Sequence, residues 1–247
     1  MWIIAGREWC SLLTGLLGWS ILALVQFILA WVFAVLVYVF TQSDVQAQLL
    51  QQEGMPGMSE LILTPWFNWL GFILVFITPF LTMRLIAEER RQHSLILLLS
   101  APLSTWQIVL GKFIGIWGFI TLLLLIAMLM PLSLLFGTTL DMGQLAAAFL
   151  AAWLLSAALI AVGLYLSIRN HQPLVAAMTT LVVLLLLWIL DWAGGDESAL
   201  FHYLSLQTHY QVLITGLVDS THILYYIWVS LFFLGLSYHQ LDSERAN

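Results

Sequence analysis

The chain has 247 residues, of which 62% are hydrophobic and only 8% are charged, and its formal net charge is −6. Soluble globular domains carry about 25% charged residues. This composition excludes a water-soluble fold, and the length leaves no room for a large soluble domain beside the apolar stretches described below.

The N-terminal segment, residues 1–17, is predicted to form an amphipathic helix that lies flat on the cytoplasmic surface of the membrane. Arg7, Ser11 and Thr14 fall on its polar side. Its apolar side is formed by Trp2, Ala5, Trp9, Leu13 and Leu16.

Six apolar stretches follow, each long enough to cross a bilayer core of about 30 Å. The first is too long for the apolar part of a signal peptide, and no small-x-small cleavage site follows it. Because lipid forces backbone groups to pair within a segment, all six are predicted to be helices. The six predicted spans are Leu16–Phe40, Leu61–Met83, Thr105–Phe136, Gln144–Ile168, Pro173–Trp192 and Ile223–Tyr238. The expected fold is therefore an all-α integral membrane protein with six transmembrane helices, formed by a single domain of residues 1–247.

Two connecting segments are informative. Residues 84–104, between the second and third spans, contain the charged run Glu88-Glu89-Arg90-Arg91-Gln92, which on charge alone is typical of a solvated loop. Residues 193–222, between the fifth and sixth spans, carry apolar residues at helical spacing. That spacing predicts short helices on or in the outer leaflet.

The basic residues set the orientation, because cytoplasmic segments of membrane proteins are enriched in Lys and Arg. With the N-terminus inside, the outer loops 41–60, 137–143 and 193–222 contain acidic residues but no Lys or Arg. Both termini are therefore expected in the cytoplasm. The residues that fall on the cytoplasmic side or at a cytoplasmic helix end are Arg7, Arg84, Arg90, Arg91, Lys112, Arg169 and Arg245.

The spans carry no groups for ion coupling or catalysis. No ionisable residue lies in the middle of a predicted span, whereas ion and proton pathways use such residues. The only Gly-Lys pair, Gly111-Lys112, is followed by Phe113, so the phosphate-binding motif G-x-x-x-x-G-K-[ST] is absent. The sequence also has no G-x-S-x-G and no H-E-x-x-H. We expect no enzyme activity and no metal site, and any energy for transport must come from another chain.

Small residues mark faces on which helices can approach closely. Gly111, Gly115 and Gly118 share one side of the third span, and Ala148 and Ala152 belong to an alanine-rich side of the fourth. These faces suit packing within one chain or between two copies, and the sequence leaves both open.

The stretch from Met83 to Gly118 carries a longer pattern. It resembles the permeases of ABC-2-type exporters, in particular their gliding-motility-like branch. In that family the inner loop reads roughly M-R-L-x-A-E-E-[RK]-x-x-G-T-x-E-L-L-L-x-x-P-[LV]-[ST], and the next span opens with x-x-V-L-G-K-[FY]. Here His93 and Ser94 replace the Gly-Thr pair, and Ile96 replaces the following Glu. The matching residues are Met83, Arg84, Leu85, Ala87, Glu88, Glu89, Arg90, Leu97, Leu98, Leu99, Pro102, Leu103, Ser104, Val109, Leu110, Gly111, Lys112 and Phe113.

This resemblance implies half of a transporter in the inner (cytoplasmic) membrane of a bacterium. Two permeases, either identical copies or paralogues, would pair, each seated on a cytoplasmic ABC ATPase that binds ATP and magnesium. The permease itself would hold no cofactor. Other implied partners are membrane lipid and a periplasmic accessory subunit, and no nucleic acid is expected. By the same resemblance, the residues that couple the permease to the ATPase would be Arg7, Glu8, Glu88, Glu89, Arg90 and Arg91.

Two other functions stay open. A membrane enzyme or cofactor-handling maturation factor would bind a metal or haem through His202, His209 and His222, or through the Trp188–Trp192 region, although the histidine spacings fit no standard ligand pattern. A non-transporting scaffold that transmits force would keep an ATPase partner. The substrate is not readable, but the apolar spans favour a lipid-like or amphipathic cargo.

Overall fold

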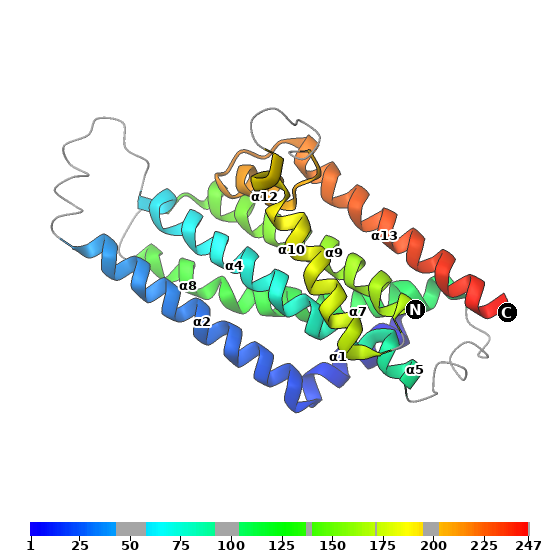
Figure 1. Cartoon of the computed structure of the whole chain (residues 1–247). Coiled ribbons are helices and arrows are strands. Elements are labelled where there is room, and N and C mark those ends of the chain that lie inside the picture. The colour runs from blue at the N-terminus through cyan, green and yellow to red at the C-terminus, as the bar shows by residue number, and fades with distance from the viewer. Residues whose placement is uncertain (43–57, 92–103, 137–139, 171, 195–202, 247) are drawn as a thin grey trace.

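The computed structural model describes residues 1–42, 58–91, 104–136, 140–170, 172–194 and 203–246 (Figure 1). Every regular element in these ranges is a helix, and six helices are long and apolar enough to cross a membrane. The predicted all-α membrane protein is therefore confirmed. The spanning helices are α2 (Leu16–Thr41), α4 (Met58–Thr82), α7 (Thr105–Ala127), α9 (Met142–Arg169), α10 (Pro173–Gly194) and α13 (Ser220–Ala246).

The shorter elements continue or join these spans. The helix α1 (Trp2–Thr14) precedes α2, and α12 (Leu206–Ile214) lies between α10 and α13. A π-helical turn, η1 (Arg84–Glu88), and a short helix, α5 (Glu89–Arg91), extend α4. Beyond α7 the third span continues as α8 (Leu129–Leu132) and the 3₁₀ turn η2 (Ser133–Phe136). Pro131 accounts for this break, because its ring conflicts with the carbonyl four residues earlier and it has no N–H to donate.

Both termini lie at one end of the bundle, because six spans return the chain to the side on which it began (Figure 1). We call this the terminal end, and the other, where α12 lies, the opposite end. All seven Lys and Arg residues lie at or near the terminal end: in α1, in the extension of α4, in the first turns of α7, and at the last residues of α9 and α13.

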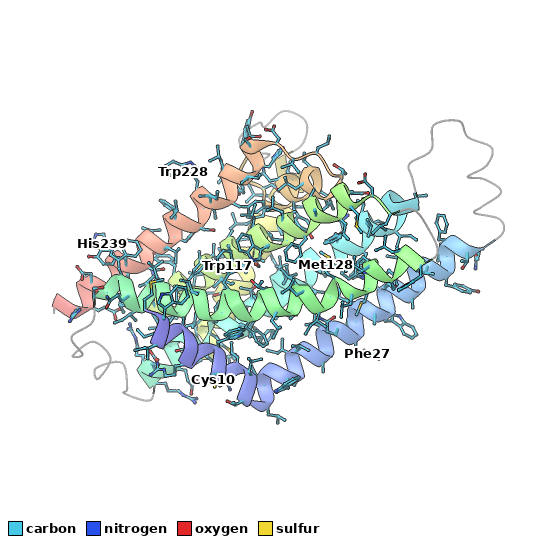
Figure 2. All side chains as sticks on the ribbon, turned by 180° about the vertical axis from the view of Figure 1, so that it is seen from behind. Cys10, Phe27, Trp117, Met128, Trp228 and His239 are labelled. Carbon is cyan, nitrogen blue, oxygen red and sulfur yellow. The ribbon has the colours of Figure 1, made fainter. Side chains whose placement is uncertain are left out.

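The helix α9 occupies the centre of the bundle and contacts α4, α7, α10, α12 and α13. Ala148 and Ala152 are fully buried on it, so these alanines serve packing within the chain. Trp153 of α9 stacks on Trp117 of α7, with ring centroids 4.2 Å apart. By contrast, α2 lies at the edge of the bundle, where Phe27 projects outward (Figure 2).

Polar side chains within the spans join helices. Gln26 donates to the Leu123 carbonyl at 2.9 Å, which fastens α2 to α7. The Trp153 indole donates to the Thr121 hydroxyl at 3.0 Å, and Asn68 pairs with Gln211 of α12. A polar group in lipid needs such a partner. These residues are therefore structural.

The end of the sixth span and the packed face of the N-terminal helix differ from the predictions. The sixth span was expected at Ile223–Tyr238, whereas α13 continues to Ala246 because its charged last turns bond to other helices at the terminal end. The N-terminal helix was expected to turn Trp2, Ala5 and Trp9 to the membrane together. Ala5 is instead buried with Ile4, while Trp2 and Trp9 stay exposed, so the packed face lies about a quarter turn from the predicted stripe.

Candidate functional site

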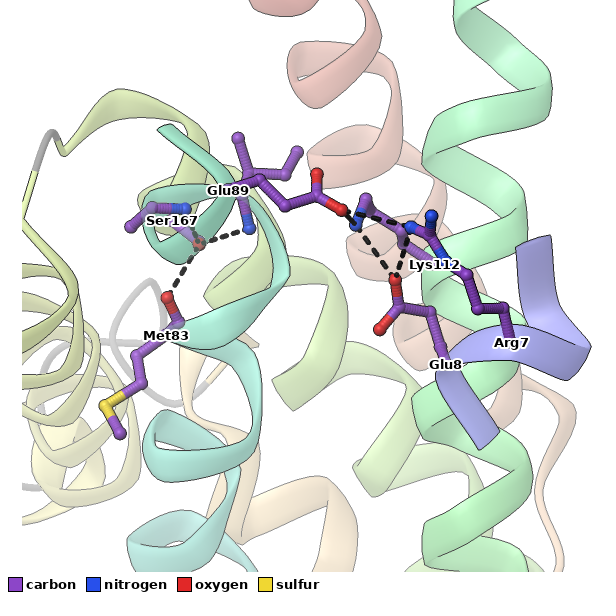
Figure 3. A network of polar contacts seen from close by, with 8 residues as sticks. Arg7, Glu8, Met83, Glu89, Lys112 and Ser167 are labelled. Carbon is purple, nitrogen blue, oxygen red and sulfur yellow. Dashed lines mark hydrogen bonds and ion pairs between the residues drawn. The ribbon is translucent and has the colours of Figure 1, made fainter. Parts of the chain in front are cut away.

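An ion-pair cluster at the terminal end is centred on Lys112 of α7 (Figure 3). The helix begins at a capping box, in which the Ser104 hydroxyl accepts from the Gln107 N–H and the Gln107 side chain accepts from the Ser104 N–H, both at 3.3 Å. This start places Lys112 two turns into an apolar helix. Its side chain is only 1% exposed. A buried ammonium needs anionic partners, and it has two.

The two partners come from different elements. Lys112 Nζ lies 3.0 Å from Glu8 Oε1 of α1 and 2.7 Å from Glu89 Oε1 of α5. Arg7 reaches the same two carboxylates, at 3.4 Å and 3.2 Å. Two cations thus face two anions, and the set is neutral. Three segments distant in sequence are joined at one buried point.

Glycines allow α1 to approach α7 closely enough for this contact. A Cβ added at Gly111 would lie 2.9 Å from Ile4 Cβ, and one added at Gly115 would lie 2.8 Å from Glu8 Cβ. Real Cβ atoms essentially never come that close, so any larger residue would push α1 away. Gly118 differs, because a Cβ there would meet nothing within 4 Å. Two of the three predicted glycines therefore serve contact within the chain, while Gly118 makes no close contact among the described residues.

The π-helical turn η1 presents Glu89 to the cluster. The Ser167 hydroxyl of α9 accepts from the backbone N–H groups of Ile86 and Ala87, both at 3.3 Å, and donates to the Met83 carbonyl at 3.5 Å (Figure 3). A π turn inserts one extra residue into a helix and is common at functional positions. Here α9 supplies the partner that satisfies the loosened backbone groups.

Arg90 points to other partners than its neighbour Glu89. Its guanidinium donates to the Ile168 carbonyl of α9 at 3.1 Å and forms an ion pair with Glu244 near the end of α13. Near this pair, the Thr105 hydroxyl donates to the Asp242 carboxylate of α13 at 3.0 Å. The end of α13 is thereby fastened to the start of α7 and the end of α9.

Glu88 and Arg91 form the outermost pair. Arg91 Nη2 lies 2.8 Å from Glu88 Oε1, and the two residues are three positions apart in the sequence. The side chain of Arg91 is 65% exposed. The predicted coupling residues thus divide into two kinds. Glu8, Glu89 and Arg90 hold the terminal end together, whereas Arg7, Glu88 and Arg91 have part of their charge at its surface. The rest of the predicted 84–104 loop, residues 92–103, lies outside the described residues.

At the opposite end, two of the histidines considered for a metal or haem contact each other directly. His209 Nδ1 and His222 Nδ1 are 2.6 Å apart, and His209 Nε2 lies 3.1 Å from the Tyr203 carbonyl. A carbonyl only accepts, so His209 carries its proton on Nε2 and His222 donates to His209 Nδ1. No cluster of three or more metal-binding side chains occurs among the described residues. His202 lies outside them, and so do the side chains of Asp191 and Trp192.

Asp219 lies beside this pair and caps the start of α13. Its carboxylate accepts from the Thr221 N–H at 3.2 Å, and this backbone hydrogen bond holds the pKa of Asp219 below its usual value. The predicted outer helices of residues 193–222 are represented by α12, and residues 195–202 lie outside the described part.

Sequence reasoning missed the residues that complete the cluster. Lys112 was noted as part of an incomplete phosphate-binding motif, as a positive charge near a helix end and as a match to the family pattern, but not as a coupling residue. A usable signal existed, since a charged residue eight positions into an apolar span requires a partner. Ser167, Asp242 and Glu244 gave no signal, because their roles depend on contacts across the bundle.

Comparison with known proteins gives the family. The sequence model for the ABC-2 family transporter proteins matches residues 2–238, nearly the whole chain. A comparison with curated proteins found no match. Permeases of this family are the membrane components of ABC transporters, contain no nucleotide-binding domain of their own and usually work with an ATPase subunit. The chain therefore belongs to the ABC-2 family of transporter proteins and is a multi-pass permease subunit.

Proposed function

We propose that this chain is the permease of an ATP-driven exporter, and that the Lys112 cluster carries movement of a separate ATPase into the spans. The observation that carries the proposal is the buried meeting of α1, α5 and α7 at Lys112, at the end of the bundle with all the basic residues. In this proposal α1 and α5 lie at the cytoplasmic surface of the membrane, and α7 is a span. A force applied to either of the first two therefore reaches α7 through ion pairs rather than through a loop.

The charge distribution supports a cytoplasmic location for the terminal end. Positive residues favour the cytoplasmic side of a membrane, and here all seven lie towards one end. The expected location is the inner membrane of a bacterium, where a cytoplasmic ATPase with bound ATP and magnesium would meet this surface. A second permease, identical or paralogous, and a periplasmic accessory subunit at the opposite end belong to the same proposal.

The cluster suits this task because its central lysine is buried, while charged residues at its edge are accessible to a partner. We call these edge residues, Arg7, Glu88 and Arg91, the rim. Lys112 is almost fully buried, but Arg7 is 60% exposed and Arg91 is 65% exposed. Exposed charges at an interface set orientation and association rate. The glycine contacts then make α1 and α7 move as one unit, because α1 packs closely against the backbone of α7 at Gly111 and Gly115.

The test is co-purification from the native membrane in mild detergent, followed by ATPase assay in reconstituted vesicles. We expect a soluble ATPase to be recovered with the permease. The double variant Glu88→Ala with Arg91→Ala should reduce its recovery several-fold, because both residues lie at the rim and neither contacts Lys112. Arg169→Ala is the matched control: this exposed arginine at the end of α9 hydrogen-bonds, within the described part of the chain, only to the Tyr165 hydroxyl.

A permease recovered without any ATPase, or a rim variant that retains full ATPase recovery and stimulation, would contradict this assignment. Changing Glu89 is a less specific test, because its carboxylate also holds Lys112. The combined change of Glu88 and Glu89 to Ala should still reduce coupling, but thermal melting must show that α1 remains docked.

A further inference from the structure

An apolar groove runs along the face of the bundle between α2 and α4. It has a volume of about 590 Å³. Aromatic rings line its α4 side at a spacing of three to four residues, and aliphatic residues line its α2 side. The aromatic residues are Trp69, Phe72, Phe76 and Phe80.

A second hollow of more polar lining adjoins the groove at the terminal end. Leu17 and Ser20 line both hollows, so the two lie side by side. The second hollow, about 490 Å³, lies between α1, the start of α2 and the end of α4, and its wall includes Ser11 and Arg84. The two hollows together form an apolar groove along the spans and, at the terminal end, a mouth whose wall contains serine hydroxyl groups and one arginine.

Arg84 supplies a positive charge that the fold leaves uncompensated. No ion pair or hydrogen bond joins its side chain to any residue in the described part of the chain, and the side chain is exposed. Glu8 also borders the pocket, but Lys112 and Arg7 neutralise it. The surplus charge at the mouth is therefore that of Arg84.

We propose that this groove binds an anionic phospholipid of the surrounding leaflet, with an acyl chain between α2 and α4 and the phosphate at Arg84. Basic pockets between membrane helices on the cytoplasmic side bind anionic head groups in this way. The aromatic wall suits a flexible chain, and the hydroxyl group of Ser11 can donate to a phosphate or ester oxygen. The assignment does not depend on the ATPase.

A second copy of the chain suits the site less well. It would have to offer Arg84 a carboxylate, and the described acidic residues at the terminal end already bond to Lys, Arg or Thr of their own chain. Lipid, in contrast, brings both a phosphate and a chain of the right chemistry. These acidic residues are Glu8, Glu88, Glu89, Asp242 and Glu244.

Native mass spectrometry of the full chain in detergent tests the site, with dioleoyl phosphatidylglycerol and dioleoyl phosphatidylcholine as the two probes. We expect the wild-type protein to retain phosphatidylglycerol preferentially. Arg84→Ala should lower this preference about fivefold, the effect of roughly one basic residue at an anionic surface. Arg169→Ala removes a charge from the same end of the bundle but away from the groove, and should leave the preference unchanged.

Ser20→Trp tests the acyl-chain half, because the new ring would fill the point where the two hollows meet. It should reduce retention of both lipids while the melting temperature stays near that of the wild type. Equal retention of the two lipids by the wild type, or equal losses in Arg84→Ala and Arg169→Ala, would overturn the proposal. So would conversion of a dimer to a monomer by Ser20→Trp without loss of lipid, which would make the groove an interface between copies.

Discussion

The two ends of the bundle are held together by different forces. At the terminal end, helices meet through charges: Lys112 with Glu8 and Glu89, and Arg90 with Glu244. At the opposite end they meet through neutral hydroxyl and amide groups, such as Tyr210, which donates to the Phe67 carbonyl at 2.7 Å. Ion pairs with an exposed member, such as those of Arg7, depend on salt and on approaching charges, whereas buried neutral hydrogen bonds do not. This difference agrees with the proposed function, in which a partner acts on the terminal end.

The largest expected loss of stability follows from a change at the centre of the ion-pair cluster, at the terminal end. Lys112→Met would leave Glu8 and Glu89 facing each other without a buried cation, which costs about 3–5 kcal/mol when one partner of a buried ion pair is removed. An unfolding titration in sodium dodecyl sulfate, with tryptophan fluorescence as the readout, measures the loss. Adding Glu8→Gln and Glu89→Gln should restore most of the stability. Equal stability of the single variant and the wild type would show that the cluster is not a structural centre.

A steric change at the same end should cost less. Gly115→Leu places a side chain where Glu8 Cβ and the Ala5 carbonyl already lie, and overpacking of this kind costs about 1–3 kcal/mol. Protease accessibility of α1, followed by gel electrophoresis, should increase. Gly118→Leu is the matched control, since nothing lies within 4 Å of a Cβ there. Similar behaviour of the two variants would contradict the close α1–α7 contact.

Breaking a contact at the opposite end should lower stability less, and the loss should not depend on salt. Tyr210→Phe removes a buried hydroxyl that bonds α12 to α4, at a cost of about 1 kcal/mol. The same titration at low and high salt should give the same difference from the wild type. Tyr38→Phe, at an exposed tyrosine of α2, should change nothing. A salt-dependent loss for Tyr210→Phe would remove the distinction between the two ends.

The smallest expected effect on stability is at the rim. Arg91→Ala breaks an exposed pair with Glu88, and such pairs contribute about 0–1 kcal/mol. The change should therefore leave the unfolding curve nearly unaltered while weakening ATPase recovery. A stability loss as large as that of Lys112→Met would place Arg91 in the core of the cluster instead.

The sequence predicted the parts of the fold that depend on composition. Lipid requires long apolar helices, so the spans of α2, α9 and α10 were located within two residues at each end. The extension of α13 could not be predicted, because Asp242 and Glu244 look like tail residues until their partners on α7 and α5 are known. The packed face of α1 was misjudged for a related reason. Trp2 and Trp9 dominate its hydrophobicity, but the glycines of α7 select Ile4 and Ala5.

The candidate site divides in the same way. Arg7, Glu8 and Glu89 were identified through the family resemblance, and the structure brings these three together at Lys112. Their exposure could not be predicted, because burial depends on which helices enclose them. The π-helical turn was equally hidden, since the hydroxyl that satisfies it belongs to Ser167, some 80 residues further along the chain.

That turn makes the terminal end sensitive to the number of residues as well as to their identity. Within a regular α-helix, one residue more or less rotates everything beyond it by about 100°. A π turn already takes up one extra residue, so a deletion within Arg84–Glu88 would convert the turn to regular helix and leave the direction of the Glu89 carboxylate nearly unchanged. A further insertion has no such turn to take it up and would swing Glu89 away from Lys112. We therefore expect the terminal end to tolerate the loss of one residue here better than the gain of one.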